Sequence, residues 1–261
     1  MEIIGYVSAV LIGISLGLIG GGGSILTVPV LVYFFGIDAF LATEYSLFIV
    51  GISSAAGSVA YLKNGQADLK TALVFGVPSI VSIFLTRVYI VPLIPPELLK
   101  IGNFTLTRSI FLLLIFALLM IVASYKMIRK VGEERLKSRR ENTFLAAGEG
   151  ILVGALTGLV GAGGGFMIIP ALVGLLKMPM KRAVGTSLVI ISLNSLIGFL
   201  SSVGQTAIKW PFLISVAAIA VGGIIVGSHL SKKIDGRKLK PAFGWFILVM
   251  GISIILKEAF L

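Results

Sequence analysis

Two glycine-rich segments of the sequence have the composition of an anion-binding backbone. The first runs from Gly17 to Ser24 and the second from Gly158 to Gly165, and a proline follows five residues after each. Glycine permits backbone conformations and close approaches that a side chain would prevent. A helix that begins after such a break carries N–H groups without intrahelical partners, together with the positive end of its dipole. Both features favour the binding of a small anion.

The candidate substrate-binding residues therefore gather at and after these two breaks. Ser24 and Thr27 add hydroxyl groups to the first break, whereas Gly165 and Ile168 occupy the matching positions of the second, so we expect an asymmetric site. The alternative roles are close helix packing for the glycines and interhelical or backbone hydrogen bonds for the polar residues. The complete candidate set is Gly20, Gly21, Gly22, Gly23, Ser24, Thr27, Ser46, Gly161, Gly163, Gly164, Gly165, Thr186, Ser187 and Asn194.

Both breaks belong to an internal duplication of the chain. At an offset of 141 residues, positions 17–32 match positions 158–173 at 8 of 16 places, and positions 42–57 match positions 183–198 at 6 of 16. Paired halves with interrupted apolar segments are typical of secondary transporters, whose substrate site lies where the interruptions meet. We therefore expect the two glycine loops to lie face to face near the middle of a bilayer.

Composition indicates a membrane protein. Of the 261 residues, 57% are hydrophobic and 13% charged, and the mean hydropathy is +1.08. Residues 3–36 carry no charge and residues 143–176 carry only Glu149, so each segment exceeds the roughly 20 residues that span a bilayer. We expect an all-α polytopic membrane protein of two inverted four-unit repeats, each opening with a glycine-broken hairpin. The repeats are residues 1–128 and 143–261, and a basic loop, residues 129–142, joins them.

The positions of the cations predict the orientation of the chain in the membrane. With residues 129–142 in the cytoplasm, seventeen of the 22 lysines and arginines fall inside and five outside. This distribution places both ends of the first hairpin outside and both ends of the second inside, which makes the repeats inverted. It also explains the net charge of +11 without nucleic acid. We expect a multi-pass protein of the inner or plasma membrane.

Ionisable residues within apolar segments are costly and usually functional. Glu149 alone lies clearly inside such a segment, so its carboxyl group is the candidate that couples transport to protons, with a structural carboxylate as the alternative. We expect Glu44, Arg87 and Arg108 near the outer surface and His229 near the inner one, with their polar ends at the interface. The chain has no cysteine and one histidine. Nucleophile–base pairs and metal clusters are therefore not expected, and neither are enzymatic activity, a bound metal or a cofactor.

The motifs also resemble those of a known family. Two glycine-rich tracts that run into a proline, the related phrases Ala42–Leu47 and Ala183–Leu188, and the basic loop in mid-chain resemble the TauE/SafE family of membrane permeases. The resemblance covers nearly the whole chain and departs at Tyr45, where the family usually has the threonine of a Thr-Ser pair. It implies a permease for sulfite, an organosulfonate or a related sulfur oxyanion that exports by alternating access. A passive anion channel is the open alternative, a membrane-embedded enzyme is less favoured, and homo-oligomer formation stays open.

Overall fold

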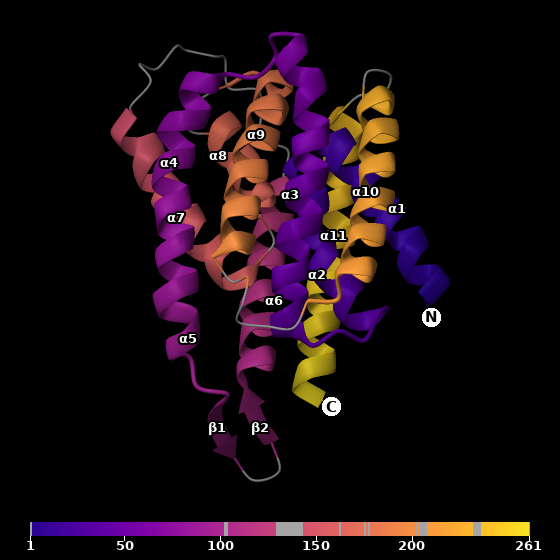
Figure 1. Cartoon of the computed structure of the whole chain (residues 1–261), viewed down its shortest axis with the longest axis vertical. Coiled ribbons are helices and arrows are strands. Elements are labelled where there is room, and N and C mark those ends of the chain that lie inside the picture. Colours follow the sequence, from indigo (N-terminus) through magenta and orange to yellow (C-terminus); the bar gives the residue numbers. More distant parts are fainter. Residues whose placement is uncertain are drawn as a thin grey trace.

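Helices build both halves of the chain, as the apolar segments predict (Figure 1). The first half comprises α1 (Glu2–Ile19), the 3-10 turn η1 (Gly21–Gly23), α2 (Ser24–Tyr33), α3 (Ala39–Lys63), α4 (Leu69–Leu85), the π turn η2 (Thr86–Ile90), α5 (Val91–Leu93) and α6 (Arg108–Ile128). The second half comprises α7 (Thr143–Val160), α8 (Gly165–Gly174), α9 (Met180–Leu200), α10 (Trp210–Leu230) and α11 (Gly236–Phe260).

This computed structural model describes residues 2–101, 104–128, 143–161, 163–174, 176, 178–201, 203, 208–231 and 236–260. The basic loop, residues 129–142, lies outside the described residues. Two features were not expected from the apolar pattern. One is the π turn η2, and the other is an antiparallel pair of strands, β1 (Glu97–Ile101) and β2 (Phe104–Thr107), between α5 and α6.

The duplication reappears in the order of the helices. α1 and α7, α2 and α8, α3 and α9, and α4 and α10 each begin 141 residues apart, as the starts at Ala39 and Met180 illustrate. Each half opens with a hairpin broken at its glycines, since α1 and α2 flank the first break and α7 and α8 flank the second. The strands and the π turn occur in the first half only, among the residues that the structure describes.

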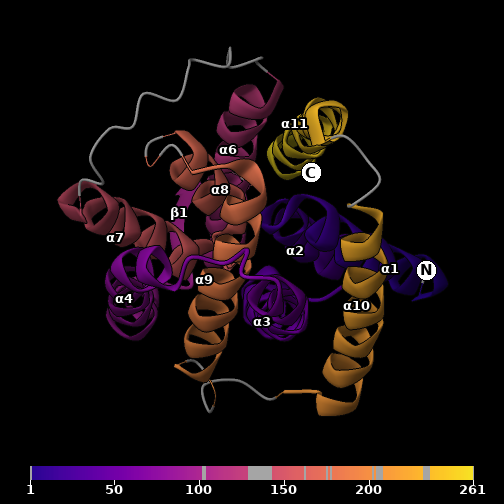
Figure 2. The same ribbon diagram turned by 90° about the horizontal axis from the view of Figure 1, so that it is seen from above.

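In each half, the first helix packs against the fourth α-helix of the other half. α1 packs along α10 of the other half, and its equivalent α7 packs along α4. Figure 2 shows these two pairs on opposite sides of the central helices α3 and α9. A Cβ atom on Gly17 of α1 would lie 2.5 Å from a backbone oxygen of α10, and one on Gly154 would overlap the backbone of α4. Small residues thus bring the helix backbones into contact, as is usual in membrane bundles.

The equivalent helices α3 and α9 pack against each other in opposite directions. A Cβ atom on Gly51, midway along α3, would lie 2.9 Å from the side chain of Leu196, which is near the end of α9. At the other end of the pair, Gly185 in the first turns of α9 lies against Tyr61, near the end of α3. Equivalent helices that run antiparallel are what an inverted repeat requires, and the placement of the repeats relative to a bilayer stays a prediction.

Among the described residues, four helices are long and apolar enough to cross a membrane. They are α3, the continuous helix Leu69–Leu93 that contains the π turn, α9 and α10. The arms of the first hairpin differ in length: the 18 residues of α1 rise about 27 Å and the 10 residues of α2 about 15 Å. Because the hydrocarbon core is about 30 Å thick, α2 is too short to cross it.

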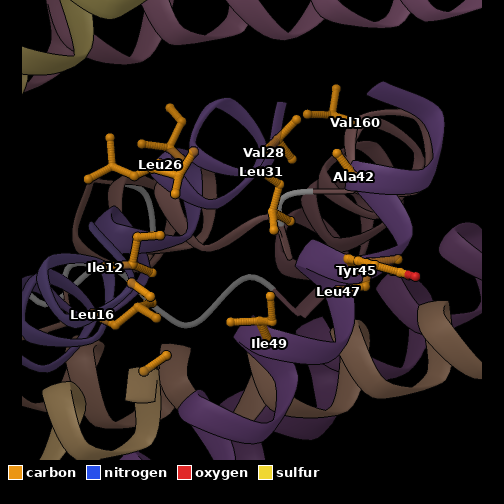
Figure 3. Packing of buried hydrophobic residues seen from close by; sticks show 14 of the residues in the cluster. Ile12, Leu16, Leu26, Val28, Leu31, Ala42, Tyr45, Leu47, Ile49 and Val160 are labelled. Atoms are coloured by element: carbon orange, nitrogen blue, oxygen red, sulfur yellow. The ribbon is translucent and has the colours of Figure 1, made fainter. Parts of the chain in front are cut away.

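A continuous apolar core holds the first break in position. Ile12 and Leu16 of α1, Leu31 of α2 and Leu47 of α3 are fully buried and pack in one cluster (Figure 3). The same cluster includes Val160, the last residue of α7, directly before the second break. Burial of these side chains therefore links the two breaks through packing that involves both halves of the chain.

The absence of cysteine from the sequence makes single-cysteine labelling a clean test of orientation. We expect a membrane-impermeant thiol reagent to modify Asp38→Cys, before α3, only from outside the cell. The same reagent should modify Lys181→Cys, at the start of the equivalent helix α9, only from the cytoplasmic side. Both positions are exposed. Labelling of Lys63→Cys from inside would confirm that α3 crosses, and reaction of the first two positions from one side would contradict the inverted arrangement.

Candidate functional site

The two glycine breaks meet backbone to backbone. A Cβ atom on Gly21 would overlap the backbone of Gly165, and a Cβ atom on Gly165 would lie 2.5 Å from the Cα atom of Gly21. A side chain at either position would therefore force the breaks apart. The sequence prediction that the two loops face each other is confirmed, while their depth in the bilayer stays a prediction.

The backbone at both breaks adopts conformations that favour glycine. Gly20 and Gly161, which directly follow α1 and α7, have φ values of 75° and 72°. A positive φ is strained for residues with a side chain, so glycine allows each helix to end at a defined point. The second break contains two further positive angles, 66° at Gly163 and 68° at Gly164, where the first forms a 3-10 turn. The breaks thus have different backbone geometry, in line with an asymmetric site.

One face of α9 lines both breaks. The Oγ atom of Ser187 would lie 3.1 Å from a Cβ atom on Gly20, and the Oγ atom of Ser195 would lie 2.5 Å from one on Gly163. Ile191, between them on the same helical face, contacts the second break. A single helix therefore presents two hydroxyl groups, about two turns apart, to the two opposed glycine loops.

The equivalent face of α3 lines the second break. Thr43 lies against Gly161, and Val50 lies beside Gly163. Ser46 and Ser54 are four residues before and after Val50, so they occupy the same helical face. Both serines are fully buried. The two antiparallel helices α3 and α9 thus border the breaks with small and hydroxyl-bearing residues.

Several buried polar atoms around this region have no hydrogen-bond partner within the described part of the chain. Thr157 faces the second break directly, because a Cβ atom on Gly164 would overlap its hydroxyl oxygen. Buried polar atoms are normally paired, and exceptions often mark a place where a ligand or water binds. These atoms can therefore hydrogen-bond a polar solute. The residues that carry them are Thr27, Ser46, Ser53, Ser54, Thr157, Asn194 through its Oδ1 atom, and Ser195.

Two of the predicted hydroxyl groups donate to carbonyl oxygens three residues earlier in the chain. Ser24 donates to the carbonyl oxygen of Gly21 over 2.7 Å, and Ser187 donates to the carbonyl oxygen of Val184 over 2.8 Å. Such bonds use the hydroxyl proton and leave oxygen lone pairs as acceptors. Ser24 therefore stabilises the turn of the first break in addition to lining it.

Two further hydroxyl groups join the halves of the protein through equivalent hydrogen bonds. Thr186 accepts from the backbone N–H of Asp68 over 2.9 Å, and Tyr45 accepts from the backbone N–H of Lys209 over 2.7 Å. Residues 45 and 186 are equivalent in the duplication, as are residues 68 and 209. Tyr45 stands where the resembled family usually has a threonine. The structure shows that its hydroxyl group makes the bond that threonine makes in the second half.

Asn194 connects the site to α4. Its Nδ2 atom donates to the Oγ atom of Ser79 over 2.7 Å, so the amide has a fixed orientation.

The structure keeps Glu149 apart from the breaks. This half-buried residue precedes Val160 by 11 residues in α7, which corresponds to about 16 Å along the helix. Any coupling through its carboxyl group must therefore act at a distance from the glycine loops.

The expectation that the polar ends of Glu44 and Arg87 extend to water was wrong, because both side chains are buried within the protein. Their exposed fractions are 1% and 3%, and the guanidinium Nη2 atom of Arg87 donates to Thr43 over 3.2 Å. The π turn occupies residues 86–90 and contains Arg87. The apolar pattern there predicts a regular helix and does not indicate that the Arg87 side chain points into the protein. Arg108 is half-buried over the ring of Phe40 at 4.2 Å, and His229 is exposed.

Comparison with known proteins supports a transport function. Residues 6–254 match the family model of the sulfite exporter TauE/SafE. The chain is 29% identical to a probable membrane transporter protein of Xylella fastidiosa strain Temecula1, over 94% of this chain and 91% of that protein. It is 25% identical to the probable membrane transporter protein YunE of Bacillus subtilis, over 98% and 99% of the two chains.

A further relative comes from an archaeon. The chain is 27% identical to a probable membrane transporter protein of Methanocaldococcus jannaschii, over 97% of this chain and 94% of the relative. No solved structure matches the chain. The family match extends over both glycine breaks and both of the helices, α3 and α9, that line them. The chain therefore belongs to the sulfite exporter TauE/SafE family of membrane proteins.

Proposed function

We propose that the protein is a secondary transporter that exports a small anion, such as sulfite, an organosulfonate or a related sulfur oxyanion, across the cell membrane. The observation that carries this proposal is the backbone contact between Gly21 and Gly165, surrounded by buried hydroxyl groups without partners. The family match and the names of the relatives support transport as the general activity. The proposed orientation places residues 129–142 in the cytoplasm.

The chemistry of the breaks favours an anion over a cation. The residues that line them are glycine, serine, threonine, valine and isoleucine, all uncharged. Their polar contribution consists of hydroxyl groups and the positive ends of α2 and α8, where the N–H groups of Ser24 and Met167 already bond to the carbonyl oxygens of Gly21 and Gly164. Several short donors around one point suit the oxygens of a compact oxyanion. The positive ends of the α2 and α8 dipoles, which lie at the two breaks, add a favourable field.

The arrangement of the halves favours a carrier over a channel. Each break belongs to one half and is lined by helices of both, so a relative movement of the halves would change access to the breaks from either side. Alternating access in transporters with related repeats proceeds by such movements around a fixed site. A passive anion channel with the same lining is the second candidate, because uncharged dipoles also line selective pores.

Flux measurements in proteoliposomes test the proposal. We expect saturable, protein-dependent counterflow of radiolabelled sulfite, inhibited by sulfonates and less by small carboxylates and neutral solutes. Saturation follows because a carrier must complete a conformational cycle for each solute, on the microsecond to second timescale of such transitions. Conductance without counterflow would instead support the channel, and the absence of flux for every sulfur oxyanion and sulfonate would contradict the proposed substrate class.

A further inference from the structure

A buried pair of opposite charges lies beside the second glycine break. Glu44, near the start of α3, interacts electrostatically with Arg87 in the π turn, and both residues are almost fully buried. Arg87 belongs to the apolar helix Leu69–Leu93, one of the candidate membrane spans. Charged residues at such positions are rare, and they usually mark a substrate or ion pathway.

We propose that Arg87 is the fixed positive charge that binds the transported anion beside the second break, and that Glu44 is the internal counter-ion that the anion replaces. This inference rests on the proposed anion transport and identifies a binding group for it. The guanidinium group presents several N–H donors in a planar fork that matches an oxyanion, which an ammonium group does not. A sulfonate or sulfite oxygen can thus take the place of a carboxylate oxygen.

A continuous set of contacts joins Arg87 to the glycine loop. The Nη2 atom of Arg87 donates to the Oγ1 atom of Thr43 over 3.2 Å. Thr43 in turn packs directly against Gly161, where a Cβ atom would lie 2.5 Å from the carbonyl oxygen of Thr43. The guanidinium group is therefore one side chain away from the positive-φ glycine that opens the second break. An anion held at that break lies within electrostatic range of Arg87 in a medium with little water to screen the charge.

The local backbone supports a specific role for Arg87. The N–H of Val91 bonds to the carbonyl oxygen of Thr86, which is the i to i−5 pattern of a π turn. Such turns insert one residue into a helix, alter the direction of neighbouring side chains and occur frequently at functional sites. Gly158, in the last turn of α7, lies against Thr86, so the π turn packs on the helix that leads into the second break.

The charged pair belongs to one half of the duplication. The positions equivalent to Glu44 and Arg87 are Gly185 and Ser228, both uncharged. α10, the counterpart of the helix that carries Arg87, is regular from Trp210 to Leu230. A transporter with two equal anion sites would carry the same charged pair in both halves of the duplication. One charged site beside one break fits the binding of a single anion, with the uncharged first break completing its coordination.

Competition between Glu44 and substrate gives a result that a purely structural ion pair does not. Sulfite counterflow in proteoliposomes should show a KM at least about tenfold lower in Glu44→Gln. The internal carboxylate no longer competes for Arg87, so a larger fraction of the protein is competent to bind the anion. Glu44→Asp, with a shorter side chain, should change KM in the same direction. Arg87→Gln should raise KM at least about 30-fold, and Arg87→Lys should retain part of the affinity.

Matched variants at the same end of the molecule serve as controls. Arg108→Lys and Glu97→Gln, on the half-buried Arg108 and the exposed Glu97, should leave KM unchanged. An unchanged KM in both Glu44 variants or in Arg87→Lys, with saturable flux in the unmodified protein, would overturn the inference alone. No saturable anion flux by the unmodified protein would overturn the proposed function and this inference together.

Discussion

Replacement of Gly21 or Gly165 by alanine is expected to reduce anion transport at least about 100-fold, because small displacements of a binding site have effects of this size. In each variant the new methyl group would overlap the backbone of the opposite break. Backbone atoms cannot move aside as a flexible side chain can, so the two loops must separate. Initial rates of sulfite counterflow, normalised to the amount of reconstituted protein, measure the effect.

Two glycines in open surroundings supply matched controls for the loop variants. A Cβ atom on Gly148 of α7 or on Gly222 of α10 would have nothing within 4 Å. Alanine at these helical positions should preserve transport and raise stability by about 0.5–1 kcal/mol, since alanine favours the helix. If Gly21→Ala and Gly165→Ala transport at the unmodified rate, contact between the breaks is not required for function.

Glu149→Gln is expected to abolish anion accumulation driven by a pH gradient while leaving exchange at equal pH intact. Glutamine keeps the shape of the side chain and its hydrogen-bonding capacity but cannot bind and release a proton. Exchange needs only the binding site and the change between conformations, whereas accumulation also needs the coupled ion. Since Glu149 lies about 16 Å along α7 from the second break, its substitution should not change the KM of exchange.

The measurement compares sulfite uptake with and without an imposed pH gradient in the same proteoliposomes. Glu97→Gln, which removes an exposed carboxyl group from β1, is the matched control and should accumulate sulfite like the unmodified protein. Accumulation by Glu149→Gln that follows the pH gradient as in the unmodified protein would show that this carboxyl group has a structural role. The coupling proton would then have to bind elsewhere.

Tertiary structure decided which polar side chains belong to the site, and the sequence alone was a poor guide. α3 and α9 carry hydroxyl-bearing residues among apolar ones without a clear division into an apolar and a polar face, so they lack the amphipathic pattern that indicates which face points inward. Thr157 was outside the candidate set, although it faces the second break. Thr186 was within it, although its hydroxyl group accepts the N–H of Asp68. Whether a polar side chain faces the break depends on the rotation of its helix about the helix axis. That rotation is set by packing against the neighbouring helices.

The same reason explains why the burial of Glu44 and Arg87 could not be predicted from the sequence. Their places near the ends of apolar segments suggested the membrane interface, because long charged side chains there usually extend to water. A π turn has no clear sequence signature, and it alters the direction of Arg87 relative to a regular helix. In the sequence, Glu44 and Arg87 lie in two different apolar segments. Their proximity depends on tertiary contacts such as the hydrogen bond from Arg87 to Thr43, which joins residues 44 positions apart.

By itself, the sequence determined the helical class, the duplication and the two glycine breaks. These features depend on local chemistry: apolar segments long enough to span a bilayer form helices because their backbone groups must be paired there, and glycine runs interrupt them. Only the tertiary structure decided that Gly21 touches Gly165, that α1 pairs with α10, and that Arg87 turns inward. Such contacts join distant residues, so they depend on how close-packed helices fit together in three dimensions.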